Sequence, residues 1–515
     1  MPTAYCEKPA RPYVLAATIL GSSMAFIDGT VVNVALPALQ SAFHATAVDV
    51  QWVIESYALF LAALLLVGGS LGDHFGRRRT YSAGVAFFAL ASVGCGIAPN
   101  ITYLIAARAV QGIGGAMLVP GSLAIISASF PKEDRGQAIG VWSGFTAITA
   151  AIGPVMGGWL IEHISWRAVF FLNVPIAIAV LTLTYRYVPE SRDNKAASEL
   201  DWLGAILATA GFGALVYALI ESSSRGFLNT MVVSALIVGV IASALFFLVE
   251  ERKKNPMLPL VLFRSMDFSG ANLLTFLLYA ALSGMLYFLP QNLIQVQRYS
   301  ATAAGAALLP FILIMFLMSR WAGGLVARYG GRLPLMIGPM IAAVGFALFI
   351  RPDVDANYWT MFFPAVVVLG FGMAVSVAPL TTTVMNAVDE SRAGIASGVN
   401  NAVSRTAGLF SVAVFGIIML QIFAHRFEES LRKIPLPPGT IGFLSAQRFN
   451  LGGVTIPADL DPALRAAVRQ AVDKSFVCGF RELMILSAGL ALLSAVAAAF
   501  MIRGASPSSK QSSSS

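Results

Sequence analysis

The sequence predicts an all-α polytopic membrane protein. Its 515 residues are 57% apolar and only 12% charged, and the mean hydropathy is +0.76. Soluble domains carry about 25% charged residues, so a chain this apolar requires lipid as its solvent. The chain also holds many apolar runs that reach the roughly 20 residues a helix needs to cross a bilayer.

Fourteen such runs follow one another along the chain. Most are apolar on every face rather than alternating, which excludes strands, and a helix satisfies its own backbone hydrogen bonds in hydrocarbon. We therefore expect fourteen transmembrane helices. They cover residues 13–38, 50–71, 81–98, 101–129, 136–160, 168–188, 202–220, 227–249, 269–293, 301–328, 333–350, 360–385, 394–424 and 481–502.

Lysines and arginines indicate the orientation, because they are enriched on the cytoplasmic side. With the N-terminus inside, nineteen of them lie on the inner side and twelve on the outer side. We expect a multi-pass protein of the cell inner membrane with both termini cytoplasmic. The net charge of +8 then reflects topology and not nucleic-acid binding. The first apolar run is too long for a cleavable signal peptide.

An internal repeat predicts two related halves. Gly69, Leu71, Phe75 and Gly76 recur in register 254 residues later as Gly323, Leu325, Tyr329 and Gly330. We expect two pseudo-symmetric six-helix bundles, 1–190 and 266–503, flanking two inserted helices with their linkers at 191–265. The second bundle would carry a long outer loop at 425–480, and a Ser-rich disordered tail would cover 504–515. Such halves can rock about a midplane site.

Three ionisable residues lie within the expected spans, where a charge is costly and signals a function. Asp28, Glu55 and Arg108 lie roughly 14, 8 and 11 Å from the outer ends of their helices at about 1.5 Å per residue. Their similar depths predict one cluster that binds a proton or a cationic substrate in competition. A structural ion pair between helices is the alternative. Arg405, beside Asn400 and Asn401, is a candidate for the polar wall of a substrate cavity.

Two further segments are candidates for gates. In the loop after the second span, Asp73 can meet a helix N-terminus or an arginine across the interface between the halves, while Arg77 and Arg78 can also serve only as topogenic charges. The fifth span contains a proline that bends the helix among glycines that allow close packing. We expect Gly153, Pro154, Gly157 and Gly158 to form a seam that seals the cavity, although ordinary helix packing would use the same residues.

These motifs, in this order, resemble the major facilitator superfamily, and specifically its fourteen-helix drug:proton antiporters. The resemblance covers nearly the whole chain. It is carried by Asp28-Gly-Thr30 through Asn33 to Pro37, Gly69-x-Leu71-x-Asp73-x-x-Gly76-Arg77-Arg78, Leu104-x-x-x-Arg108-x-x-Gln111-Gly112-x-Gly114, Gly153-Pro154-x-x-Gly157-Gly158, Trp166-Arg167 with Asn173-x-Pro175, and Asp201-Trp202-x-Gly204. Thr149 departs from the pattern where the fifth-helix motif usually has another glycine.

The resemblance implies a multidrug efflux transporter that exchanges protons for amphipathic, cationic drugs or dyes by alternating access. Asp28, Glu55 and Arg108 would couple to protons, and Asp28, Glu55, Asn33, Gln111 and Arg405 would contact the substrate. We expect no cofactor, no enzymatic activity and a functional monomer in the lipid bilayer. The alternative is an exporter of one specific metabolite, lipid or antibiotic. The fifth-helix motif disfavours uptake, and the four histidines lack metal-ligand spacing for a membrane enzyme.

Overall fold

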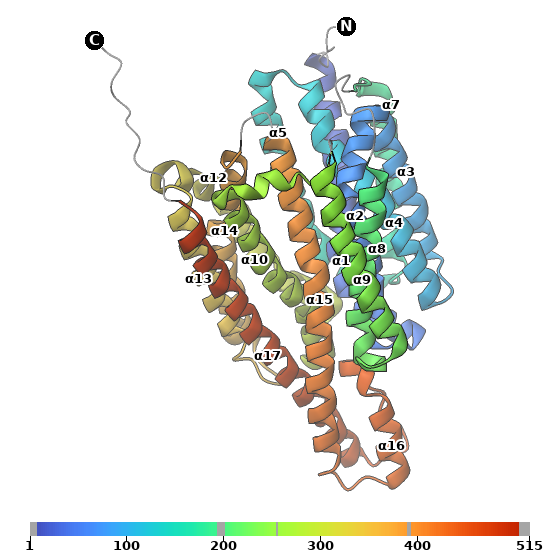
Figure 1. Cartoon of the computed structure of the whole chain (residues 1–515). Coiled ribbons are helices and arrows are strands. Elements are labelled where there is room, and N and C mark those ends of the chain that lie inside the picture. The colour runs from blue at the N-terminus through green and yellow to red at the C-terminus, as the bar shows by residue number, and fades with distance from the viewer. Residues whose placement is uncertain (1–7, 193–200, 254–255, 389–392, 504–515) are drawn as a thin grey trace, which may run out of the picture.

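The computed structural model describes residues 8–192, 201–253, 256–388 and 393–503, and most of them are helical (Figure 1). The α-helices are α1 (Arg11–Phe43), α2 (Ala47–Phe75), α3 (Arg77–Gly96), α4 (Ile101–Ser129), α5 (Lys132–His163), α6 (Ala168–Phe171), α7 (Asn173–Tyr187), α8 (Trp202–Arg225), α9 (Thr230–Arg252), α10 (Met266–Gln291), α11 (Ala301–Ala306), α12 (Leu309–Tyr329), α13 (Arg332–Leu348), α14 (Phe363–Asn386), α15 (Ala393–Leu431), α16 (Pro438–Ala446) and α17 (Pro462–Met501). Short 3-10 or π segments are η1 (Lys8–Ala10), η2 (Leu260–Arg264), η3 (Asn292–Val296), η4 (Tyr358–Phe362) and η6 (Arg448–Gly453).

Polar residues between the apolar runs fix where several helices begin. Thr46 opens α2 with a capping box, in which its hydroxyl accepts from the Asp49 amide while the Asp49 carboxylate accepts from the Thr46 amide at 2.9 Å. Asn100 accepts from the Tyr103 amide at 2.8 Å at the start of α4. These side chains satisfy backbone N–H groups that a helix leaves free at its first turn.

Eleven helices of the described chain are long and apolar enough to cross a membrane. The spans expected at 81–98, 136–160 and 333–350 coincide with α3, α5 and α13, which are not among the eleven; α13 is apolar but shorter. Arginines open α3, and charged residues open α5, so both start outside an apolar run. The chain is therefore a multi-pass, all-helical membrane protein.

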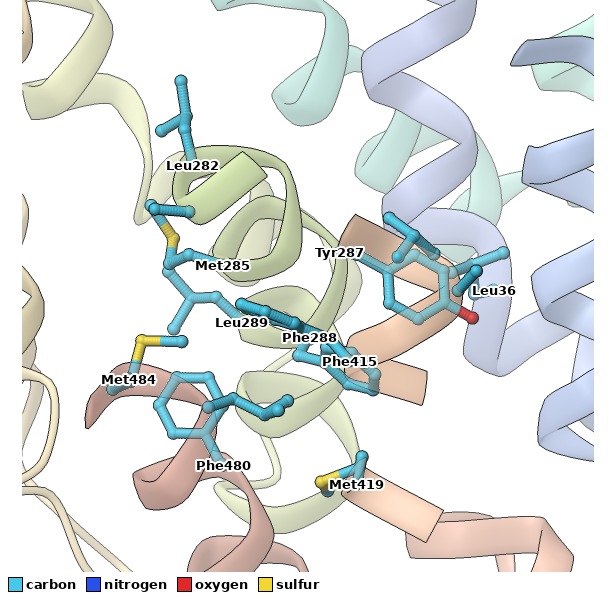
Figure 2. Close-up of a cluster of buried hydrophobic side chains, with 14 of the residues drawn as sticks. Leu36, Leu282, Met285, Tyr287, Phe288, Leu289, Phe415, Met419, Phe480 and Met484 are labelled. Carbon is cyan, nitrogen blue, oxygen red and sulfur yellow. The ribbon is translucent and has the colours of Figure 1, made fainter. Parts of the chain in front are cut away.

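The inserted helices α8 and α9 pack on each other beside the main bundle (Figure 1). Through α8 they contact both α2 and α15. Helices α10, α15 and α17 share an apolar core that includes Phe288, Phe415 and Phe480 (Figure 2). In the same view the Tyr287 hydroxyl of α10 points toward Leu36 of α1, so this core reaches the N-terminal helices.

One end of the bundle carries α16, and we call it the α16 end (Figure 1). The segment 425–480, expected as a loop, is largely helical: α15 continues to Leu431 and α17 starts at Pro462. The sequence of this segment is less apolar because the ends of α15 and α17 extend beyond the apolar runs, although both helices continue there. The expected tail at 504–515 lies outside the described residues.

Candidate functional site

Asp28 and Arg108 form an ion pair in the interior of the N-terminal helices. Arg108 Nη1 donates to Asp28 Oδ2, and the exposed fractions of the two residues are 2% for Asp28 and 0% for Arg108. The guanidinium also donates from Nε to the Val53 carbonyl of α2 at 3.1 Å. The pair thus joins α1, α2 and α4, as the similar depths of Asp28 and Arg108 in the sequence predicted.

Amide and hydroxyl groups complete a network around this pair. Gln111 Nε2 donates to Asp28 Oδ1 at 2.8 Å, and Gln111 Oε1 accepts from Arg108 at 2.6 Å. Ser92 of α3 accepts from Gln111 at 2.9 Å and from Asn173 of α7 at 2.8 Å. Both carboxylate oxygens of Asp28 therefore accept a hydrogen bond. The carboxylate is held by polar groups inside an otherwise apolar helix bundle.

The ring of Tyr57 covers the Arg108 guanidinium, with the central carbon 4.2 Å from the ring centroid. This distance suits a cation–π contact in a desolvated site. Sequence reasoning did not select Tyr57 or Ser92 as site residues. A tyrosine and a serine in apolar helices carry no signal of their own, because such residues are common at packing positions.

Glu55 stands apart from the Asp28–Arg108 pair. It is 1% exposed, and neither of its carboxylate oxygens has a hydrogen-bond partner among the described residues. Gln51, one helical turn earlier on the same face of α2, donates to the Val412 carbonyl of α15 at 3.0 Å. Glu55 therefore lies on the side of α2 that meets the C-terminal helices.

The other expected substrate residues lie in different surroundings. Gln111 belongs to the Asp28 network described above. Asn33 is partly exposed, and its side chain donates to the Gly29 carbonyl of its own helix at 3.4 Å. Arg405 is partly exposed on α15.

The charged residues of the loop between α2 and α3 interact within the N-terminal helices. Asp73 accepts two hydrogen bonds from Arg77, at 2.8 and 2.9 Å, and among the described residues it has no arginine partner across the interface. The amide of Arg78 donates to Glu190 Oε1 at 3.1 Å. Arg77 is the first residue of α3, so Asp73 contacts that helix through this side chain.

The glycines of α5 form two close contacts. Gly153 and Gly157 face Thr30 and Val31 of α1, where an added Cβ would overlap the side chains. Gly158 faces the backbone of Ala301 in α11, and a Cβ there would lie 2.5 Å from the Thr302 nitrogen. These residues join α5 to α1 on one side and to the C-terminal helices on the other.

A reciprocal contact completes this seam. Gly305 of α11 faces the carbonyl group of Pro154, and an added Cβ would lie 2.5 Å from the carbonyl carbon. Proline at 154 leaves a gap in the helix hydrogen bonding of α5, so the backbone there can bend. Backbone therefore packs directly on backbone where the two sets of helices meet.

Polar contacts that sequence reasoning missed also join the two sets of helices at the α16 end. Gln295 donates to Gln40 Oε1 at 2.8 Å, and Gln40 donates to the Asn450 carbonyl at 2.9 Å. The Glu162 carboxylate accepts from the amide and the hydroxyl of Thr302, each at 2.7 Å. Backbone hydrogen bonds and the Thr302 hydroxyl lower the pKa of Glu162 against the opposing effect of burial, which raises it.

A separate cavity of about 320 Å³ lies between α2, α8, α9, α10 and α15. Its lining is apolar except for Thr406, and five of the lining residues are phenylalanines: Phe212, Phe246, Phe247, Phe263 and Phe276. The volume is near the lower limit for a small-molecule site. The inserted helices thus border a space that an apolar group can enter.

Comparison with known proteins agrees with this arrangement. Residues 18–412 match the sequence model of the Major Facilitator Superfamily. Multidrug resistance protein Stp of Mycobacterium tuberculosis (strain CDC 1551 / Oshkosh) is 36% identical over 425 residues, which are 82% of this chain and 79% of Stp. The tetracenomycin C resistance and export protein of Streptomyces glaucescens is 31% identical over 511 residues, 97% of this chain and 94% of that protein.

Solved structures support the same fold. A bacterial homolog of the human lysosomal transporter Spinster, in an inward-facing and unoccupied conformation, has a TM-score of 0.65 at 20% identity and covers 98% of this chain and 100% of that one. The xylose transporter XylE from E. coli, in an inward-open conformation, has a TM-score of 0.59 at 14% identity, with 96% of both chains covered. At these identities the likeness concerns the fold alone.

Proposed function

The chain belongs to the major facilitator superfamily and to its drug-efflux transporters, and we propose that it exchanges protons for amphipathic drugs or dyes. It is a transporter and not an enzyme. The proposal includes fourteen membrane spans, two pseudo-symmetric halves, inner-membrane location with cytoplasmic termini, and action as a monomer. The relatives include proteins named for resistance to puromycin and to methylenomycin A, which supports antibiotic or drug export.

The buried network around Asp28 is the observation that carries the proton-coupling proposal. An ion pair placed inside an apolar bundle costs desolvation energy that its attraction barely repays, so it is poor evidence for stability and needs another reason. Arg108 and Gln111 hold Asp28 in place, while a second carboxylate, Glu55, faces the other half. Asp28 and Glu55 lie on opposite sides of α2. These two carboxyl groups would bind protons beside the interface between the two halves.

Contacts between the two sets of helices support alternating access. The seam at Gly158 and the hydrogen bonds of Gln40 and Glu162 all lie at the α16 end, which we assign to the outer side. Contact between the two sets of helices at the outer side is what an inward-facing conformation requires. Protonation of a carboxylate removes its charge from the interface, which makes reorientation through the bilayer less costly.

Transport by the purified protein in liposomes tests this proposal. Ethidium and 8-anilinonaphthalene-1-sulfonate are followed under an imposed pH gradient for the parent protein, Asp28→Asn and Glu55→Gln. Glu429→Gln serves as the control, because Glu429 lies at the α16 end and is 45% exposed at its side chain. We expect both site variants to lose most of the pH-driven transport and the control to keep it.

A second measurement separates coupling from folding. Substrate added to the weakly buffered protein should release protons from the parent and fewer from Asp28→Asn or Glu55→Gln. Normal pumping by both variants would show that these carboxylates are not the proton sites. Transport of one compound from a chemically varied panel would instead favour an exporter of a specific metabolite, lipid or antibiotic.

A further inference from the structure

Arg405 faces α2 across the interface between the two halves. It follows Gly398 by seven residues and precedes Gly416 by eleven, and at about 3.6 residues per turn both intervals return to nearly the same helix face. A Cβ at Gly398 would lie 3.3 Å from Leu66, and one at Gly416 would lie 2.6 Å from Gln51 Oε1. Both neighbours belong to α2, so Arg405 faces α2 as well.

The depth of Arg405 follows from the same contacts. Helices α2 and α15 run in opposite directions, and Arg405 lies between the levels of Gln51 and Leu66, near Tyr57. It is about 18 Å from the start of α15 at 1.5 Å per residue. The hydrocarbon core is about 30 Å thick, which places the guanidinium well inside the membrane.

No acidic side chain neutralises this guanidinium in the part of the chain that the structure describes. Asp28 is occupied by Arg108, and Glu55 has no hydrogen-bond partner among the described residues. Since Asp28 and Arg108 cancel, the interface carries an excess positive charge whenever Glu55 holds a proton.

We propose that Arg405 binds the acidic group of the substrate, so that this transporter exports amphipathic weak acids as their anions. The inference rests on the proposed function and specifies its substrate class. A guanidinium offers a planar fork of donors to a carboxylate, sulfonate or enolate. The sequence assigned cationic substrates to the carboxylates of Asp28 and Glu55. Arg108 and Gln111 occupy Asp28, and of these two carboxylates Glu55 alone has no hydrogen-bond partner among the described residues.

The anion site at Arg405 is separate from Glu55. Gln51, one helical turn before Glu55, meets Gly416 of α15, and Gly416 lies eleven residues after Arg405. The anion and the proton therefore occupy different groups. Export of one anion against entry of one proton moves two charges, so this exchange responds to membrane potential.

Dye transport in liposomes tests the assignment. The anion is 8-anilinonaphthalene-1-sulfonate and the cation is ethidium, measured for the parent, Arg405→Gln and Arg405→Lys under a pH gradient with and without a potassium–valinomycin potential. A lost charge-assisted hydrogen bond predicts an anion affinity about 10-fold or more lower for Arg405→Gln. Arg405→Lys keeps the charge and should retain part of it. Anion transport by the parent should also respond to the potential.

The outcomes are distinguishable from failure of the proposed function. Export of ethidium but not of the anion by the parent, or unchanged anion transport by Arg405→Gln, would overturn the weak-acid assignment while leaving proton-driven efflux intact. Transport of neither dye in response to the pH gradient would refute both. Retained ethidium transport or a normal unfolding temperature for Arg405→Gln excludes misfolding as the cause of its lost anion transport.

Discussion

Gly158→Ala should open the α16 end of the transporter. The added Cβ would lie 2.5 Å from the Thr302 nitrogen and equally close to the Ala301 carbonyl carbon, and backbone atoms cannot move aside as a flexible side chain can. Overpacking costs about 1–3 kcal/mol. Because the cost applies only while α5 and α11 are in contact, it should raise the ratio of open to closed molecules by about 5- to 150-fold.

Spin labels at two exposed positions of the α16 end report this change. Ile164 and Trp359 are 63% and 68% exposed and lie on different halves, and labelling requires a background in which the native cysteines are replaced by serine. Double electron–electron resonance should show an added population at longer distance for Gly158→Ala. Gly140→Ala in the same helix is the control, since its Cβ would meet no described atom within 4 Å. An unchanged distance distribution in folded Gly158→Ala would refute the packing argument.

Three further predictions concern stability, measured as unfolding in detergent. Arg108→Gln leaves Asp28 buried without its partner and should lower the unfolding free energy by about 3–5 kcal/mol; adding Asp28→Asn should restore part of the loss, and no recovery would contradict the pairing. Burial raises the pKa of Asp201, but hydrogen bonds with Lys253, Glu250 and the Gly204 amide hold that pKa below its usual value. Lys253→Met should therefore cost about 1.5–3 kcal/mol at neutral pH. A lowered pKa gives its full stabilisation above the unfolded value of about 3.9, so the difference should shrink below that pH and vanish as the pH falls through the lower folded value. Ala208→Leu should fill part of the apolar cavity without the overpacking cost of about 1–3 kcal/mol, and a large loss of stability would show that the space is not available.

From the sequence we could predict how deep in its helix a residue lies. We could not predict toward which neighbouring helix its side chain points. Asp28 and Arg108 were predicted to meet because their depths agree, and they do meet. Glu55 has a similar depth, yet it faces the other side of α2, and its position depends on how α2 turns against α15. That rotation is decided by packing among many apolar residues, which a single sequence does not specify.

The sequence also could not predict which distant segments contact one another. The glycines of α5 predicted a close helix contact, but nothing in the motif identified Ala301 and Gly305 as the facing residues. Asp73 pairs with Arg77, four residues away, and the motif alone did not distinguish this partner from an arginine across the interface. Helix ends outside the apolar region, as in α15 and α17, lose the hydropathy signal although their backbone hydrogen bonding continues.

The projecting ends of α15 and α17, together with α16, make the transporter visibly asymmetric (Figure 1). A 54.4 kDa chain embedded mostly in lipid offers few landmarks for image alignment, and this projection supplies one. It continues the C-terminal helices while η6 touches α1 through Gln40 and Asn450. An antibody fragment raised against the projection would therefore serve as an orientation marker for electron microscopy, and its angle to the N-terminal helices would report each step of the transport cycle.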